Sequence, residues 1–204
     1  AWTWGTGIVL LYVIYWAGGM MPEDFTSNDL TGEPANMSIH ILLLFTFVAV
    51  FLYDALYKSS LASNVRAVTA VSFLLITAYV FAMQHVGGFG YRAVNIHLGA
   101  LFGTNMAFNV WFRIWPAQQK IINAIKNGEA PDGDLLALAG LRSKHNTYMS
   151  VPLVWTMHNQ HHVTAPTALG IPNEFSWVLP MVMVILGWHI VWQLYKKSGT
   201  IKGF

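Results

Sequence analysis

The sequence predicts an all-α, polytopic integral membrane protein, a single helix bundle over residues 1–204. Three observations support this prediction. Hydrophobic residues make up 55% of the chain and charged residues only 10%, which is far more apolar than a soluble domain. Apolar segments of roughly 18–24 residues recur along the chain, and each is long enough to cross a bilayer core of about 30 Å. Lys and Arg gather in alternate loops, as the positive-inside rule describes.

Six membrane spans are expected, in chain order. The first is interpreted as a span and not as a signal peptide, because no basic residue precedes it and no small-residue cleavage site follows. The fifth is the shortest and contains Pro152, which makes it the least regular. Loops rich in Gly, Pro, Asn and Ser separate the spans. The expected spans are residues 2–21, 37–57, 65–85, 94–115, 147–162 and 175–195.

An even number of spans places both termini on one side, and the basic residues identify that side as the cytoplasm. All of the 11 Lys and Arg residues except Arg92 fall there. The longest loop, at about 117–146, is cytoplasmic and contains two short amphipathic helices near 118–126 and 134–141. We therefore expect a multi-pass protein of the bacterial inner (plasma) membrane, whose partner is the lipid bilayer. Because the basic pI of about 8.9 comes from few charges, no nucleic-acid partner is expected.

The chain contains no cysteine, and this restricts its redox chemistry. Disulfides, thiolate metal sites, iron–sulfur clusters and covalently attached c-type haem are all excluded on this chain. Any cofactor must therefore be held by His, Met, carboxylate or backbone groups.

Histidines concentrate on the predicted outer, periplasmic face, where six of the eight in the sequence fall. In "MHNQHH" the spacing puts three imidazoles on one side of one helical turn. His97 lies about one turn inside the bilayer, where an unpaired polar group is costly. The simpler interpretation is a set of polar helix ends. The candidate cofactor ligands are His97, His161, His40 and His158, and the candidate metal ligands are His97, His158, His161 and His162.

Three alternatives for the occupancy of this histidine cluster remain open. Haem b is commonly held by neutral imidazoles from two facing helices, which fits one histidine from each of two spans. Iron or copper would use several imidazoles, which the trio at 158–162 could supply. The third alternative is that the cluster holds no cofactor.

Other residues of the fourth span are expected to have packing roles. Gly99 and Gly103 form a GxxxG motif that favours close helix packing. Asn105 and Asn109 are expected to hydrogen-bond a neighbouring helix.

The stretches "YRAVNIHLGALFGTNMAFNVWFRIWPAQQKIINAIKNGEAPD" and "GLRSKHNTYMSVPLVWTM" resemble the membrane domain of the bacterial, cytochrome-c-linked urate hydroxylases, or membrane-bound urate oxidases. Earlier in the chain, "VFLYDALYKSSL" resembles a Tyr-Asp and Lys-Ser element of the same family. The family's upstream span and its C-terminal cytochrome c domain are not found in this sequence, and His158 and His162 are additions to the family pattern. The family-matching residues include His97, Asn109, Arg142, His145, Asn146, Tyr148 and His161, together with Tyr53, Asp54, Lys58 and Ser59.

This resemblance implies a membrane subunit that oxidises a purine-like substrate, takes its hydroxyl group from water and passes electrons to a c-type cytochrome. Two functions are therefore expected. In the first, the chain is an electron-transfer subunit whose outer histidines hold haem or metal. In the second, it is a cofactor-free structural subunit of a larger respiratory or photosynthetic complex. No catalytic residue is assigned, and whether the chain is itself an enzyme stays open.

Overall fold

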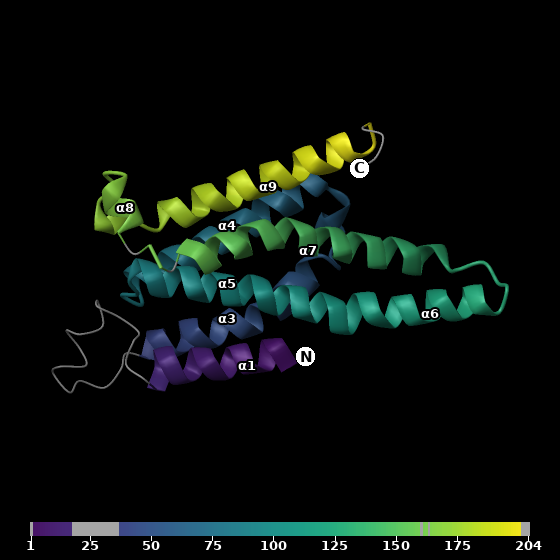
Figure 1. Cartoon of the computed structure of the whole chain (residues 1–204), viewed down its shortest axis with the longest axis horizontal. Coiled ribbons are helices and arrows are strands. Elements are labelled where there is room, and N and C mark those ends of the chain that lie inside the picture. Colours follow the sequence, from purple (N-terminus) through teal and green to yellow (C-terminus); the bar gives the residue numbers. More distant parts are fainter. Residues whose placement is uncertain (1, 18–36, 160, 163, 201–204) are drawn as a thin grey trace.

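A computed structural model describes residues 2–17, 37–159, 161–162 and 164–200, which form helices joined by turns (Figure 1). The described part contains no strand, so the all-α prediction is confirmed there. The chain begins with α1 (Trp2–Leu11) and a π-helical turn, η1 (Tyr12–Ala17). The elements that follow are α3 (Met37–Leu56), η2 (Ser60–Ser63), α4 (Val65–His85), α5 (Tyr91–Asn109), η3 (Val110–Ile114), α6 (Trp115–Lys126), α7 (Gly133–Asn159), α8 (Ala165–Ala168), η4 (Asn173–Phe175) and α9 (Val178–Ser198).

The antiparallel pair α5 and α7 forms the centre of the bundle, with α3 packed against α5 and α9 against α7 (Figure 1). Close approach is possible where small residues face large ones. A Cβ atom added at Gly99 of α5 would lie 2.5 Å from Oγ1 of Thr156 in α7. The predicted packing role is thus confirmed for Gly99. It is wrong for Gly103, whose Cβ position has no described atom within 4 Å.

Three helical segments are long and apolar enough to cross a membrane: Ile39–Leu56, Val65–His85 and Asn173–Ser198. The helix over Trp2–Ala17 is apolar but shorter, and residues 18–21 of the first predicted span lie outside the described residues. The central helices α5 and α7 are more polar, which a central position permits because neighbouring helices shield their polar groups from lipid. The arrangement of six spans remains a prediction.

The segment predicted as a cytoplasmic loop is a helical hairpin. The helix of α5 continues through the π-helical turn η3 into α6, and α7 begins at Gly133, so both amphipathic segments extend the central helices. The hairpin reaches beyond the ends of α1 and α9 (Figure 1). Pro116 has no N–H to bond the carbonyl of Phe112 four residues earlier, and Nη1 of Arg113 donates to that oxygen instead, at 3.2 Å. The helix continues past Pro116, whereas the sequence placed the start of a loop here because proline usually breaks a helix.

Candidate functional site

Two of the polar groups in the interior of the described structure lie near opposite ends of α5. The first surrounds His97, and the second surrounds Asp54 of α3. His97 and Asn109, the α5 members of the two groups, are separated by about 18 Å along the helix.

The His97 side chain is completely buried, and both of its ring nitrogens have hydrogen-bond partners. Nδ1 lies 2.8 Å from the carbonyl oxygen of Ala93, which can only accept, so Nδ1 carries the proton. Nε2 therefore carries a lone pair and accepts from Nε1 of Trp16 at 3.3 Å. Tyr15 and Phe89 flank the ring, with centroids 5.9 and 5.8 Å from it. Nε2 of this imidazole is the atom that could bind a metal.

The other predicted ligands lie in different surroundings. His40 in the first turn of α3, His158 near the end of α7, and His161 and His162 just beyond it are all exposed. The start of α3, the start of α5 and the end of α7 lie at the same end of the bundle (Figure 1). Neither hydrogen-bond partner of His97 is a histidine, and no three His, Asp or Glu side chains among the described residues are grouped to hold a metal ion. The predicted ligand set stays a prediction.

A second polar contact near His97 ties α5 to α7. Nδ2 of Asn159 donates to the hydroxyl of Tyr91 and, at 3.4 Å, to Oδ1 of Asn95. Nδ2 of Asn95 donates to the carbonyl of Tyr91 at 2.8 Å. Sequence reasoning missed these residues. The available signal was that Asn95 and Asn159 are uncharged polar residues in apolar segments, which usually bond across helices.

The polar group at the other end of α5 is centred on the buried carboxylate of Asp54, which three cationic side chains contact. Nε of Arg113 donates to Oδ1 at 2.9 Å and its Nη2 to Oδ2, while Nη2 of Arg142 donates to Oδ1 at 3.0 Å. Nζ of Lys58 lies 2.7 Å from Oδ2. We call this group the Asp54 cluster; its members are Tyr53, Asp54, Lys58, Asn109, Arg113, Arg142, His145 and Asn146.

The uncharged members of the Asp54 cluster form a directed chain of hydrogen bonds. Nδ2 of Asn146 donates to the carbonyl of Met106 at 3.2 Å, so Oδ1 of Asn146 must be the atom that accepts from Asn109. Nδ2 of Asn109 donates there at 2.9 Å and to the hydroxyl of Tyr53 at 2.8 Å. Tyr53 then donates its own proton to Nδ1 of His145 at 2.8 Å. This assignment leaves Oδ1 of Asn109 free to accept.

Arg142 is the most unusual member of the cluster because it is charged yet only 2% exposed. Its guanidinium lies over the rings of Tyr53 and Tyr57, 5.2 and 5.9 Å from their centroids. Within the described part of the chain, its Nε and Nη1 have no hydrogen-bond partner, and neither does Oδ1 of Asn109. Most buried polar atoms in native structures have a hydrogen-bond partner, so three atoms without one in a single cluster make it a candidate functional site.

His145 is half-buried in the same cluster and remains neutral. Burial, together with the positive charges of Arg142 and Lys144, lowers the pKa of His145 to about 4. A neutral imidazole with Nδ1 accepting from Tyr53 carries its proton on Nε2. His145 therefore adds no charge to the cluster near neutral pH.

Comparison with known proteins identifies the family. The chain matches a family model described as "Urate oxidase N-terminal" over residues 1–202, nearly its whole length. The chain belongs to this family. The resemblance drawn from the sequence motifs is thus confirmed. No curated protein and no solved structure matches the chain significantly.

In this urate oxidase N-terminal domain, residues that carried the resemblance gather in the Asp54 cluster although they come from three distant segments. Tyr53, Asp54 and Lys58 come from α3 and its end, Asn109 from α5, and Arg142, His145 and Asn146 from α7. Sequence reasoning did not single out Arg113. It lies four residues after Asn109, a spacing that puts both side chains on one helix face. Tyr148 lies apart from the cluster and stacks on Tyr195 of α9, with centroids 6.0 Å apart.

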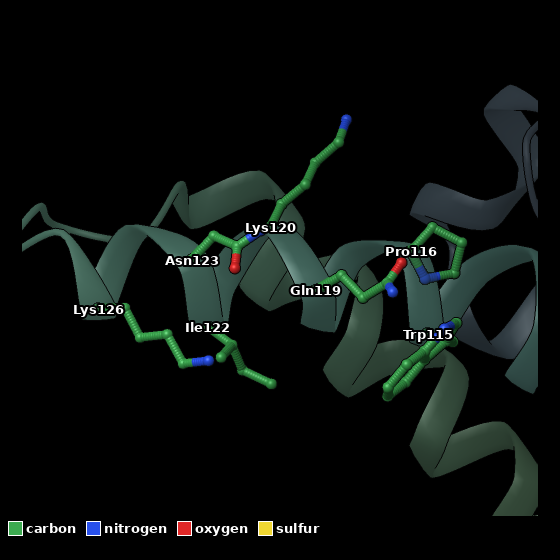
Figure 2. A pocket seen from close by; sticks show the side chains of 7 residues that line it. All are labelled: Trp115, Pro116, Gln119, Lys120, Ile122, Asn123 and Lys126. Atoms are coloured by element: carbon green, nitrogen blue, oxygen red, sulfur yellow. The ribbon is translucent and has the colours of Figure 1, made fainter.

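Two hollows on the surface of the domain lie outside both polar groups. One, of about 580 Å³, is lined by residues of α6 alone, from Trp115 to Lys126 (Figure 2). The other, of about 480 Å³, lies between the start of α4 and the middle of α9 and is lined by Arg66, Phe73 and Trp188 among others. Because a single helix cannot enclose a substrate, the hollow on α6 is a surface depression.

Proposed function

We propose that this urate oxidase N-terminal domain is the membrane part of a urate-oxidising electron-transfer system in the bacterial inner membrane. In the proposed reaction, water supplies the hydroxyl group, and two electrons and two protons leave the purine. The electrons pass to a c-type cytochrome on the outer side. The observation that carries this proposal is that the family-matching residues of three helices meet in one buried, charged cluster. Burying several charges costs desolvation free energy, and buried charged clusters of this kind are often found at functional sites.

His97 is proposed as the protein ligand of a redox cofactor. Its buried, neutral ring with a lone pair on Nε2 has the chemistry that haem b, iron or copper requires of an imidazole. Its Nδ1–H bond to Ala93 fixes the ring orientation, as is common for metal-binding histidines. His161 is the proposed second ligand, with His40, His158 and His162 as the other candidates at the same end of the bundle. When bound there, haem b would supply one-electron transfer.

The second candidate function is a cofactor-free structural subunit of a larger respiratory or photosynthetic complex. The observation that favours it is the hydrogen bond from Trp16 to Nε2 of His97, which occupies the atom that a metal would need. The two functions differ in whether the purified chain carries iron or copper.

A reduced-minus-oxidised visible spectrum, with iron and copper analysis on the same detergent-purified sample, separates the two. A sharp α-band with stoichiometric iron is expected, and the change His97→Ala should remove most of it because His97 is the buried ligand. The change His161→Ala should do the same if His161 is the second ligand. The matched control is His189→Ala, because His189 is an exposed histidine of α9 that bonds Gln193.

Three outcomes are informative. Iron or copper without a haem band would replace haem b by a non-haem site. Full cofactor content in the His97→Ala protein would exclude His97 as the ligand. A wild-type chain with neither metal nor haem, and no urate-dependent reduction of cytochrome c in membranes, would support the structural subunit.

A further inference from the structure

Two predicted membrane spans, α4 and α9, are connected at one end and in the middle. Oε1 of Gln84 in α4 accepts from the backbone N–H of Trp177 at 2.9 Å and from Oγ of Ser176 at 3.1 Å, just before α9. Nearer the middle, the ring of Phe73 meets the ring of Trp188 edge to face, with centroids 6.1 Å apart. These pairs run in opposite directions along the chain. The start of α4 and the end of α9 therefore lie at the same end of the bundle.

Between these rings and the start of α4, the two helices are held by different neighbours. Oγ of Ser72 in α4 lies 3.2 Å from the hydroxyl of Tyr57, just after α3. The hydroxyl of Tyr195 in α9 instead donates to Oγ1 of Thr147 in α7, at 3.2 Å. Among the described residues, the hydrogen bonds and ring contacts between α4 and α9 all lie at the two rings or on the Gln84 side of them. The hollow of about 480 Å³ lies where the helices are not joined.

We call this hollow the α4–α9 groove; it is lined by α4 residues from Val65 to Phe73 and by Ile185 and Trp188 of α9. Its α4 side is about 12 Å long. The lining is mostly apolar, and its charged member is Arg66 in the first turn of α4. The helix dipole opposes a cation in a first turn, so the position of Arg66 is not explained by stabilisation of α4. An apolar wall with a cation at one end matches a molecule with an apolar tail and an anionic head.

The charge at this end of the bundle is not balanced by acidic residues. Neither α4 nor α9 contains Asp or Glu. Lys196 and Lys197 in the last turn of α9 add to the charge of Arg66, and none of the three forms an ion pair with a described carboxylate. The basic loops predict that this end faces the cytoplasm, where anionic lipids attract Lys and Arg near the membrane surface. The charge therefore favours an anionic headgroup over one with no net charge.

We propose that the α4–α9 groove binds one anionic phospholipid, with an acyl chain along the apolar wall and its phosphate at Arg66. The long side chain of arginine can lie along apolar surface while its guanidinium reaches the level of the headgroups. The lipid would fill the space between two helices that are held by different neighbours. This lipid site is separate from His97 and from the Asp54 cluster, and it does not depend on urate oxidation.

Native mass spectrometry of the delipidated chain in mild detergent counts bound lipids and tests the site. The probes are dioleoyl phosphatidylglycerol and dioleoyl phosphatidylcholine, which share their acyl chains and differ in net charge. The first phosphatidylglycerol should bind at least about fivefold more tightly than the first phosphatidylcholine, because one cation near the headgroup is worth about that factor. Equal affinity for the two lipids would overturn the choice of an anionic lipid.

The change Arg66→Gln tests the headgroup contact. It should weaken phosphatidylglycerol binding about 5- to 10-fold and change phosphatidylcholine binding less than about twofold. The matched control is Lys120→Gln, which removes a cation from the lining of the hollow on α6 (Figure 2). The control should change the affinity for either lipid less than about twofold. Unchanged phosphatidylglycerol affinity in the Arg66→Gln protein would overturn the placement of the phosphate.

A second pair of variants tests the apolar wall. Ala70 lines the groove and is exposed, so Ala70→Phe should fill the groove and weaken binding of both lipids about fivefold or more. Ala78→Phe makes the same change at an exposed position of α4 outside the groove lining, and it should leave both affinities unchanged. Melting temperatures are measured first, so that only folded proteins are compared. Equal lipid affinities in these two variants would overturn the groove as the site. A dimer in the wild-type spectrum that Ala70→Phe dissociates would assign the groove to a second copy of the chain and overturn the lipid.

Discussion

Within the Asp54 cluster, the hydroxyl of Tyr53 connects Asn109 of α5 to His145 of α7. Tyr53 accepts from Asn109 and donates to His145, so the imidazole is the last acceptor in this chain of hydrogen bonds. The carbonyl of Met106 can only accept, and this fixes the directions of the two amide bonds. Tyr53 is assigned as the donor to His145 because its hydroxyl proton has no other acceptor among the described bonds. His145 must be neutral for its Nδ1 to accept, which makes its protonation a test of the whole network.

Stability should depend on pH through His145. Its pKa falls from 6.5 to about 4 on folding, because burial and two nearby cations disfavour the charged ring. The unfolded chain therefore binds a proton below pH 6.5 while the folded chain does not. Stability should then fall as pH drops from about 6.5 towards 4 and stay constant above that window. The midpoint of detergent unfolding, followed by tryptophan fluorescence from pH 7.5 to 4.5, measures this.

The change His145→Gln removes the titrating ring, and its unfolding midpoint should fall less over the acidic range than that of the wild-type chain. His189→Gln is the control, because exposed His189 belongs to α9 and lies outside the Asp54 cluster. Parallel pH profiles for wild type and His145→Gln would show that His145 is not held neutral.

The contact between α5 and α7 sets the geometry of both polar groups, and Gly99 determines how closely these helices approach. An added Cβ would lie 2.5 Å from Oγ1 of Thr156, whose hydroxyl is held by a 2.7 Å bond to the carbonyl of Leu153. Gly99→Ala should therefore destabilise the protein by about 1–3 kcal/mol through overpacking. Gly103→Ala is a matched control one turn away, where the Cβ meets open space. It should be neutral or slightly stabilising.

Thermal unfolding in one detergent compares the two variants, and a double variant tests the mechanism. Thr156→Ala removes the oxygen that the new methyl group would meet, so Gly99→Ala should cost less in that background. Equal melting temperatures for Gly99→Ala and Gly103→Ala would show that α5 and α7 are not in contact at Gly99.

For the helices, the apolar pattern of the sequence predicted their positions well, but it did not predict the lengths of the central helices α5 and α7. Residues 37–57 and 65–85 agree closely with α3 and α4. The turn between the two amphipathic segments is also where it was predicted, between α6 and α7. The sequence placed a helix end near Pro116 because proline usually breaks a helix. It could not show that a π-helical turn and Arg113 would allow the helix to continue, since that needs a side chain to reach back to a carbonyl.

Across the whole molecule, the sequence directed attention to the histidine-rich end and only partly to the Asp54 cluster. Dense histidine spacing is visible in a sequence, and His97 is indeed buried as its place in the fourth span suggested. The cluster is formed by residues as far apart as Asp54 and Arg142, and no local pattern shows that they meet. The family motifs named most of its members, but the open atoms of Arg142 and Asn109 required a three-dimensional structure.

The six-span arrangement places the α6–α7 turn in the cytoplasm and the segment before α9 in the periplasm. Because the chain has no cysteine, single cysteines can report the side of each exposed position. Lys126 and Glu174 are exposed and lie at these two places. In intact spheroplasts a membrane-impermeant maleimide should label Glu174→Cys but not Lys126→Cys, and inverted vesicles should give the reverse. Labelling of both from the same side would require an even number of crossings between them, where the six-span arrangement has one. Reversed labelling in both preparations would keep the span count and overturn the orientation derived from the basic loops.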